Sequence, residues 1–365
     1  MKKIILNLLA FIFLFNLGLF SSVQAQGCIA VRHMACATGE MFAGPIGSTN
    51  TVTEKGQVIF TTGYRFLHSY KHFVGTEEQP QRVALGTNVI NDSHSFDFGL
   101  SYALTDRWSL AINLPYNNNS RSSLYEHYGN SLESNPNQLR FKTHSSGIGD
   151  LRLTATRWMI DPSKAVKGNL AIGLGIKAPT GNGATTDDFH KLDKEKKDYL
   201  VNKYVDQSIQ LGDGSWGFNV ELQGYQSIFK NASLYYNGFY LFSPANTNAK
   251  TTLSVSDQYA GRLGINYALL PHHGLAVSLG GRLEGLPAID IIGKSEGFRR
   301  PGYILSIEPG IAWMTGHHTF AFNLPVALVR NRTKSFTDRQ DPLGLKHGDA
   351  AFADYFLSVT YAYRF

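Results

Sequence analysis

Charged side chains recur at alternating positions within apolar segments of this 365-residue chain. A strand would place these charges on one face and its apolar residues on the other. Carboxylates, guanidiniums and ammonium groups arrayed in this way can form ion pairs, or can select the solutes that pass a pore. The set comprises Arg65, Asp97, Asp150, Arg152, Lys177, Glu221, Arg262, Arg282, Glu284, Glu308 and Arg364. Six are basic and five acidic, which predicts no strong preference for anions or cations.

Two interpretations of these charges stay open. In the first, they pair with one another and fill the interior of a narrow, plugged or water-filled barrel, because barrel interiors are normally polar. In the second, a subset of them lines a path through the barrel and selects solutes by charge.

Histidine pairs raise the question of metal binding, because neutral imidazole is a good ligand for transition metals. His272-His273 and His317-His318 fall in consecutive predicted turns, but the side chains of adjacent turn residues diverge. His68 and His72 would share a face of the first strand if that strand is unbroken. Polar turns commonly carry histidine, and we predict no metal site.

Hydrolysis would require a nucleophile, a base and an orienting group brought together. The chain contains Ser, His and Asp but no Gly-x-Ser-x-Gly nucleophile motif. We therefore predict that the chain is not an enzyme and needs no cofactor, and we keep an outer-membrane hydrolase as the least favoured alternative.

The elements that must position the charges are strands. In "FDFGLSYAL", for example, Phe96, Phe98 and Leu100 share one face, with Asp97 and Gly99 opposite. Most such segments have 11 to 15 residues, and a tilted strand needs about 9–11 to cross a bilayer. We predict twelve strands: 57–74, 93–105, 107–117, 147–160, 168–180, 215–229, 232–244, 257–270, 273–287, 301–315, 318–331 and 351–365.

The predicted connections alternate between long and short from the first strand to the last. Outer-membrane barrels have this asymmetry, with short periplasmic turns and longer extracellular loops. Strands that face lipid must close into a barrel, since an open edge would leave backbone groups unpaired in hydrocarbon. We therefore predict an all-β, transmembrane antiparallel barrel of about twelve strands in an up-and-down meander over residues 56–365. A secreted β-sandwich would explain the alternation but not the asymmetry of the loops.

Residues 1–25 have the order of a secretory signal: a basic start, an apolar run and small residues before Ala25. We expect this segment to be cleaved, and residues 26–55 to form a short periplasmic segment. Cys28 and Cys36 are the only cysteines, and an exported chain would join them in a disulfide. Lipidation of Cys28 is the alternative. The formal charge of +6 falls to +4 on cleavage and indicates no nucleic-acid partner.

The last strand ends on an aromatic stripe, with Tyr361, Tyr363 and Phe365 at alternate positions. This ending resembles the sorting signal of bacterial outer-membrane barrels, which implies the barrel-assembly machinery as a partner and the outer membrane as the location. The last strand would pair with both its predecessor and the first strand. In the longest predicted loop, Leu192, Tyr199 and the residues around them at 187–208 have helical spacing, which predicts a short helix.

One family resemblance rests on short glycine-rich motifs. Gly149-Asp150-Leu151, Pro179-Thr180-Gly181 and the turn Gly212–Trp216 occur in order, with "YALTDRWSLAINLPY" at 102–116 as a looser match. Together they resemble the outer-membrane transporter family named for the meta-pathway of phenol degradation. The resemblance implies uptake of small hydrophobic or aromatic compounds and no catalytic residues.

From these features we predict a channel or transporter for small solutes, hydrophobic or aromatic compounds among them. Its partners would be outer-membrane lipid, the assembly machinery and the solute. The alternative is a non-conducting structural or partner-binding barrel. The sequence predicts neither the substrate nor the oligomeric state.

Overall fold

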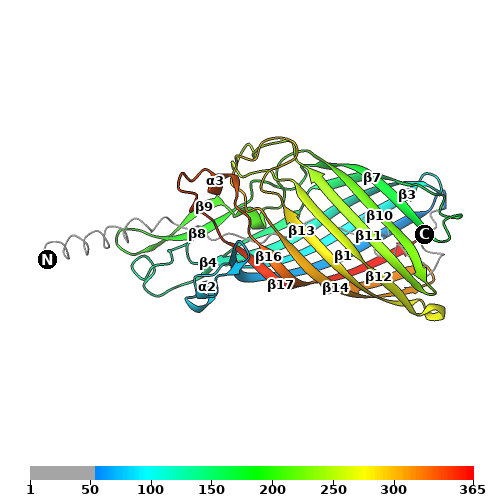
Figure 1. The fold of residues 1–365 in the computed structure, drawn as a ribbon. Coiled ribbons are helices and arrows are strands. Elements are labelled where there is room, and N and C mark those ends of the chain that lie inside the picture. The colour runs from blue at the N-terminus through cyan, green and yellow to red at the C-terminus, as the bar shows by residue number, and fades with distance from the viewer. Residues whose placement is uncertain (1–53) are drawn as a thin grey trace.

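The computed structural model describes residues 54–365, which form a closed antiparallel β-barrel (Figure 1). Two positions in the ring are each shared by a pair of collinear strands, β5 with β6 and β15 with β16, so the ring has the twelve positions that the sequence predicted. In ring order the strands are β1 (Val58–Val74), β3 (Ile90–Ala103), β4 (Trp108–Ser123), β5 (Phe141–Ile148) with β6 (Leu151–Trp158), β7 (Gly168–Ala178), β10 (Gly217–Phe229), β11 (Ala232–Phe242), β12 (Gln258–Leu270), β13 (Leu275–Leu286), β14 (Gly302–Thr315), β15 (His318–Asn323) with β16 (Val326–Asn331), and β17 (Ala350–Arg364).

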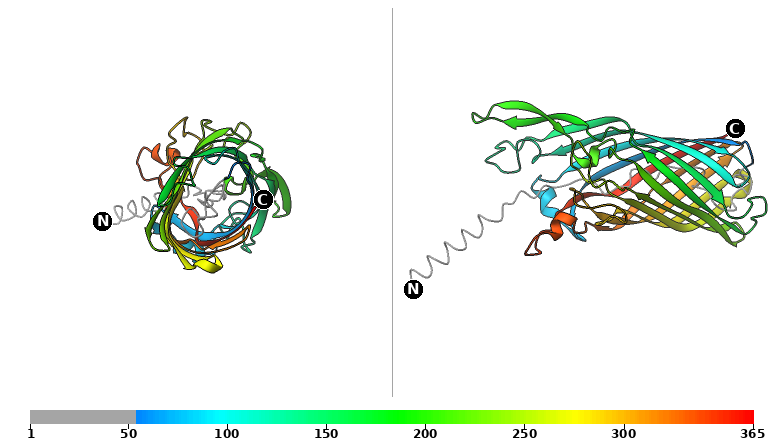
Figure 2. Two further views of the ribbon diagram at one scale, coloured as in Figure 1. Left: turned by 90° about the vertical axis from the view of Figure 1, so that its right-hand side faces the viewer. Right: turned by 90° about the horizontal axis from the view of Figure 1, so that it is seen from above.

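The barrel closes where the last strand meets the first. β17 pairs with β1 from Ile59–Arg364 to Phe73–Ala350, as the sequence predicted, with two register shifts on the way. Figure 2 shows the resulting ring from one end. Closure leaves no lengthwise edge of unpaired backbone groups, which a wall in contact with hydrocarbon requires.

Most strands have an apolar outward face and an inward face that is mainly polar, with buried apolar side chains such as Leu67 and Phe356 among the polar ones. On β3, Phe96, Phe98 and Leu100 are exposed on the outside, while Ser95 is buried against the inward-facing Asn117 of β4. The same alternation continues around the ring and forms an outward apolar belt. This division follows from the two-residue period of a strand.

Long connections lie at one end of the barrel, called here the loop end, and short turns lie at the other, the turn end (Figure 1). The loop-end connections span residues 75–89, 124–140, 179–216, 243–257, 287–301 and 332–349. They contain β2 (Glu77–Glu78), α2 (Pro80–Ala84), the hairpin β8 (Thr186–Leu192) with β9 (Asp198–Tyr204), the 3-10 turn η2 (Gln207–Ile209) and α3 (Phe336–Arg339). At the turn end, η3 (Pro271–His273) joins β12 to β13, and β17 ends there. No helix within residues 54–365 is long and apolar enough to cross a membrane.

The predicted helix in residues 187–208 is wrong. β8 and β9 form a hairpin in which Phe189 faces Val201 and His190 faces Leu200. The tip closes at Lys196, which has a φ of 62°, and Asp193 accepts backbone hydrogen bonds from the residues of the tip. Residues with good helix propensity therefore form a hairpin, because cross-strand packing outweighs a weak local preference.

Two strand bounds differ from the prediction by six residues at the loop end. β4 continues to Ser123 rather than ending at 117, and β5 begins at Phe141 rather than 147. Apart from Phe141, both extensions are polar on both faces, so the alternation of apolar residues does not reveal them. Their pairing, from Tyr116–Ile148 to Ser123–Phe141, raises this side of the wall above the apolar belt.

The backbone pairing between β16 and β17 is sparse, and this junction is called here the β16–β17 seam. β15 pairs with β17 from His318–Tyr363 to Asn323–Ser358, but β16 shares only the pair Val326–Tyr355. The Arg330 side chain bridges the seam, because its Nε donates to the carbonyl of Ala353 at 3.0 Å and its Nη2 to Asp354 at 2.6 Å.

We expect Arg330→Gln to lower the stability of the folded barrel by about 1–3 kcal/mol, because it removes charge-assisted hydrogen bonds where the backbone supplies few. The temperature at which the folded form disappears on a semi-native gel measures the effect. Arg339→Gln, on the exposed end of α3, is the matched control and should leave that temperature unchanged. Equal temperatures for Arg330→Gln and wild type would show that this side chain does not hold the seam.

Candidate functional site

The predicted inward charges form separate clusters rather than one ring. The largest, the β12–β14 cluster, contains Arg262, Arg282, Glu284 and Glu308. Arg282 donates to Glu284 at 2.7 Å and to Glu308 at 3.3 Å, and Arg262 also pairs with Glu308. Strand register explains the grouping, because Arg262 lies beside Arg282 in the ladder and Glu308 lies beside Gly280, where no side chain intervenes.

A second cluster surrounds Lys177 on β7. Its ammonium lies 3.4 Å from Asp150 and also contacts Asp213, and both Lys177 and Asp150 are buried. Asp150 lies in the break between β5 and β6 and accepts a hydrogen bond from the backbone of Gly181 at 3.0 Å. The glycine-rich motifs singled out in the sequence therefore meet around one buried carboxylate.

The remaining predicted residues have other partners. Asp97 lies in the electrostatic field of Arg65 and Arg152. The guanidinium of Arg152 also lies over the ring of Phe239 at 5.1 Å. Glu221 accepts hydrogen bonds from its inward-facing polar neighbours, such as Asn219 at 2.7 Å.

At the turn end, the last strand carries Tyr361 and Tyr363 at alternate positions. The half-buried Arg364 follows, and Phe365 is exposed. The role of this ending as a sorting signal remains a prediction. The expected cleavage after Ala25 and the disulfide between Cys28 and Cys36 lie outside the described residues.

The histidines singled out in the sequence lie apart. A register shift in β1 places His68 on the outside, 2.6 Å from Asp92, whereas His72 is fully buried and lies 2.8 Å from Asp349. The shared face would have required an unbroken strand and is therefore wrong. In the described part of the chain, no group of three His, Cys, Asp or Glu side chains could hold a metal ion.

The sequence did not reveal the feature that divides the mouth of the barrel, a segment from Val205 to Leu211 called here the strap. Val205, Ile209 and Leu211 bury their side chains and fix the segment at the loop end. Asp206 caps the 3-10 turn by accepting a hydrogen bond from the backbone of Ser208 at 2.8 Å. The strap therefore has a defined conformation, held by apolar burial and a local cap.

The strap is bound to opposite walls of the mouth. On one side, Ser208 Oγ donates to Asn91 of β3 at 3.3 Å, and Ser145 of β5 donates to the carbonyl of Ile209. On the other side, Gln207 donates to the carbonyl of Ser254, between β11 and β12, at 2.8 Å. These contacts make the strap a bridge across the ring rather than a surface loop.

Asp206 is the charged centre of this bridge. Its carboxylate lies 3.6 Å from Arg121 and accepts a hydrogen bond from Arg300 at 2.8 Å. Arg121 lies near the end of β4, the third position in the ring, and Arg300 precedes β14, the tenth of twelve. One carboxylate thus joins cations from nearly opposite walls, and we call these three residues the Asp206 latch.

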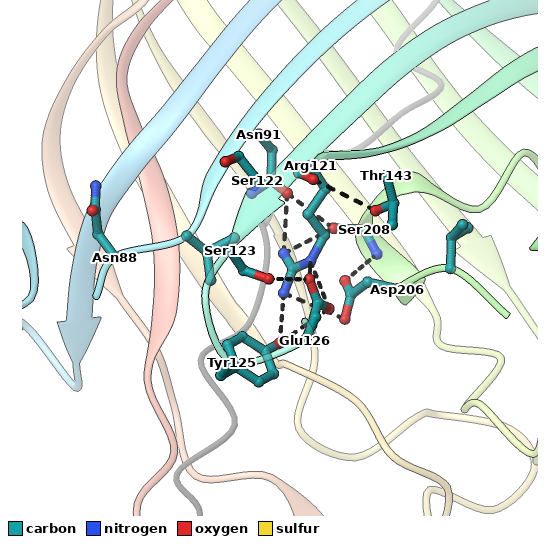
Figure 3. Close-up of polar contacts among 12 residues, drawn as sticks. Asn88, Asn91, Arg121, Ser122, Ser123, Tyr125, Glu126, Thr143, Asp206 and Ser208 are labelled. Atoms are coloured by element: carbon teal, nitrogen blue, oxygen red, sulfur yellow. Dashed lines mark hydrogen bonds and ion pairs between the residues drawn. The ribbon is translucent and has the colours of Figure 1, made fainter. Parts of the chain in front are cut away.

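Further contacts orient Arg121 within the latch (Figure 3). This fully buried guanidinium donates to both oxygens of Glu126 at 2.9 Å, to Asn91 at 3.0 Å and to the hydroxyl of Tyr125 at 2.8 Å. Burial alone would raise the pKa of Asp206, but the charges of Arg121 and Arg300 outweigh it and hold that pKa below its usual range. Asp206 is therefore ionised at any physiological pH.

Two cavities lie on the two sides of the latch. The outer one, of about 450 Å³, reaches toward the β8–β9 hairpin, and the inner one, of about 100 Å³, reaches Asp150 and Asp213 beside Lys177. Both are lined by Gln207, Thr251, Leu253 and Arg300. The latch and these residues therefore form a partition between an outer vestibule and an inner chamber.

No family model and no curated protein matches this sequence. Among solved structures, an outer-membrane channel from Pseudomonas putida F1 is similar, with a TM-score of 0.53 and 14% identity over 86% of this chain and 97% of that one. At this identity the likeness shows a shared fold, that of a β-barrel.

Two further structures score lower. The toluene transporter TbuX of Ralstonia pickettii has a TM-score of 0.42 and 11% identity over 94% of this chain and 99% of that one. The CymD monoaromatic hydrocarbon channel has a TM-score of 0.42 and 9% identity over 94% of this chain and 98% of that one. These scores are too low to carry an argument.

Proposed function

We propose that this chain is a channel for small solutes in the bacterial outer membrane, with its loop end outside the cell. The observation that carries the proposal is a closed barrel with an apolar outer belt and a charged inner face, whose mouth holds two cavities separated by a single charged latch. The apolar belt suits a lipid environment, and the inner face suits a polar path.

The path would begin in the outer cavity, pass the latch and continue beside the Lys177 cluster and the β12–β14 cluster. The paired charges along this path make the lining polar without giving it a strong net charge. We therefore expect weak selection between cations and anions. We expect stronger selection by size at the mouth, where the partition narrows the path. Hydrophobic or aromatic compounds are the solutes that the family resemblance favours.

Liposome swelling tests this proposal. Vesicles containing the folded protein should admit small neutral solutes such as glycerol, and more slowly a small aromatic alcohol, while excluding a trisaccharide at the partition. Vesicles containing heat-unfolded protein serve as the control. If vesicles with folded protein swell no faster than the control in any of these solutes, the barrel is a structural or partner-binding protein instead.

A further inference from the structure

The outer cavity has a lining of distinctive chemistry. Its volume of about 450 Å³ is within the range of cavities that hold small organic ligands, about 300–1,000 Å³. It lies between the β8–β9 hairpin, the strap and the connections that carry Tyr125, Thr251 and Phe298. Residues of four separate loop-end connections thus line one open cavity at the mouth.

Aromatic rings form much of the wall. Tyr125, Phe189 and Phe298 line it from three different connections, whereas Tyr204 follows Lys203 and belongs to the other face of β9. Phe298 has the guanidinium of Arg300 at 5.0 Å from its ring centre, and the buried Phe189 stacks on His127 at 5.4 Å. These contacts hold the two rings in place, and the part of the aromatic lining that they leave uncovered offers apolar surface to a planar ligand.

Ammonium groups lie beside these rings. Lys191 and Lys203 come from the two strands of the hairpin, and both line the cavity. Lys191 donates to the carbonyls of Glu126 and His127, each at 2.8 Å, which fixes its position. Lys203 is exposed, and within residues 54–365 its ammonium has no hydrogen-bond or ion-pair partner.

The surroundings of Lys191 favour an anion. Burial, and next the charge of Lys203, lower the pKa of Lys191. The two carboxylates of the wall, Glu126 and Asp206, are already engaged by Arg121 and Arg300. A carboxylate placed between the two lysines would offset their repulsion.

We infer that the outer cavity binds a small aromatic carboxylate, with its anionic group against Lys191 and Lys203 and its ring beside Phe189 and Phe298. The inference rests on the proposed channel function and gives it a substrate class. The cavity would concentrate such anions at the mouth, in front of the latch, where Arg300 is already paired with Asp206.

Calorimetric titration of the folded full-length protein in detergent tests the inference, with benzoate as the probe. Benzamide has the same shape without the charge, and cyclohexanecarboxylate has the charge without the aromatic ring. We expect benzoate to bind about tenfold more tightly than benzamide and about threefold more tightly than cyclohexanecarboxylate, as loss of a paired charge and of ring stacking imply. Equal affinities for benzoate and benzamide, or no binding of benzoate, would overturn the inference.

A pair of charge reversals locates the site. Lys203→Glu should weaken benzoate binding about tenfold, since a repulsive charge replaces an attractive one within the cavity. Lys164→Glu makes the same change in the exposed turn between β6 and β7, at the opposite end of the barrel and beyond the reach of a screened charge. Equal losses for both variants would place the binding elsewhere, and the wild-type comparison of ligands holds even if a variant fails to fold.

Current through a planar bilayer separates this inference from the function on which it rests. If wild-type protein conducts but benzoate neither binds nor reduces the current, the cavity inference fails and the channel proposal stands. If benzoate binds while bilayers stay silent, the channel proposal fails, and the cavity remains a binding site for aromatic anions.

Discussion

Replacing Arg282 with alanine should cost the folded barrel about 3–5 kcal/mol, the range for removing one partner of a buried ion pair. Arg282 is buried in the β12–β14 cluster, and its loss leaves Glu284 without the cation to which it is paired. The guanidinium also lies over the ring of Phe356 at 4.8 Å, so that the change removes packing on β17 as well. Urea unfolding in lipid vesicles, followed by tryptophan fluorescence, measures the loss.

Arg157→Ala is the matched control, because its exposed guanidinium lies over the ring of Trp108 at 5.6 Å on the outside of the barrel. We expect a loss of about 1 kcal/mol or less for this exposed contact. The double variant Arg282→Met with Glu284→Met should be more stable than Arg282→Met alone, since it leaves no unpaired carboxylate and Glu308 retains Arg262. If the double variant is less stable than Arg282→Met alone, the charges are not coupled as the contacts indicate.

The second large effect is expected at the latch. Asp206→Asn keeps the shape of the side chain but removes the charge that joins Arg121 to Arg300 across the mouth. If the pair contributes about 3 kcal/mol to holding the strap in place, its loss changes the ratio of closed to open mouths by about a hundredfold. Liposomes with this variant should admit trisaccharides that wild-type protein excludes.

Asp198→Asn is the control for this change. Asp198 makes a comparable contact, 2.9 Å to His190, but on the exposed hairpin away from the strap. It should leave the solute size limit unchanged. If the solute size limit of Asp206→Asn equals that of wild-type protein, the latch does not determine which solutes pass the mouth.

The latch should also resist acid. Because Arg121 and Arg300 lower the pKa of Asp206, the latch stabilises the mouth fully above the ordinary pKa of an aspartate, about 3.9, and is lost only as the pH falls through the lowered value. Acidification from pH 7 to pH 5 should therefore not open the channel. This test requires no substitution, and a rise in the solute size limit at pH 5 would contradict the assignment.

Much of the fold could be predicted because lipid and water impose a two-residue period. Phe96, Phe98 and Leu100 show that period directly, and the number of segments with this period predicted the twelve positions of the ring. The extensions of β4 and β5 could not be found in the same way, because both of their faces are mainly polar. The hairpin at 186–204 was missed because its Lys and Glu content favours a helix locally, whereas its pairing depends on contacts made in the fold.

Less of the candidate site than of the fold could be predicted from the sequence. Strand parity places Arg262, Arg282 and Glu308 on the inner face, but which charge meets which depends on the register between neighbouring strands. The latch could not be predicted from the sequence, because Asp206 and Arg300 belong to connections in which apolar residues do not recur at regular intervals. The adjacent arginines at 299–300, just before a strand, were the one available signal.

The most direct test of the central claim, that this barrel is a channel closed in part by the Asp206 latch, is single-channel recording in planar bilayers. We expect discrete currents from wild-type protein, and larger or longer-lived open states from Asp206→Asn at the same voltage. Bilayers that stay silent with both proteins, while a gel shows the folded barrel in the same preparation, would contradict the claim.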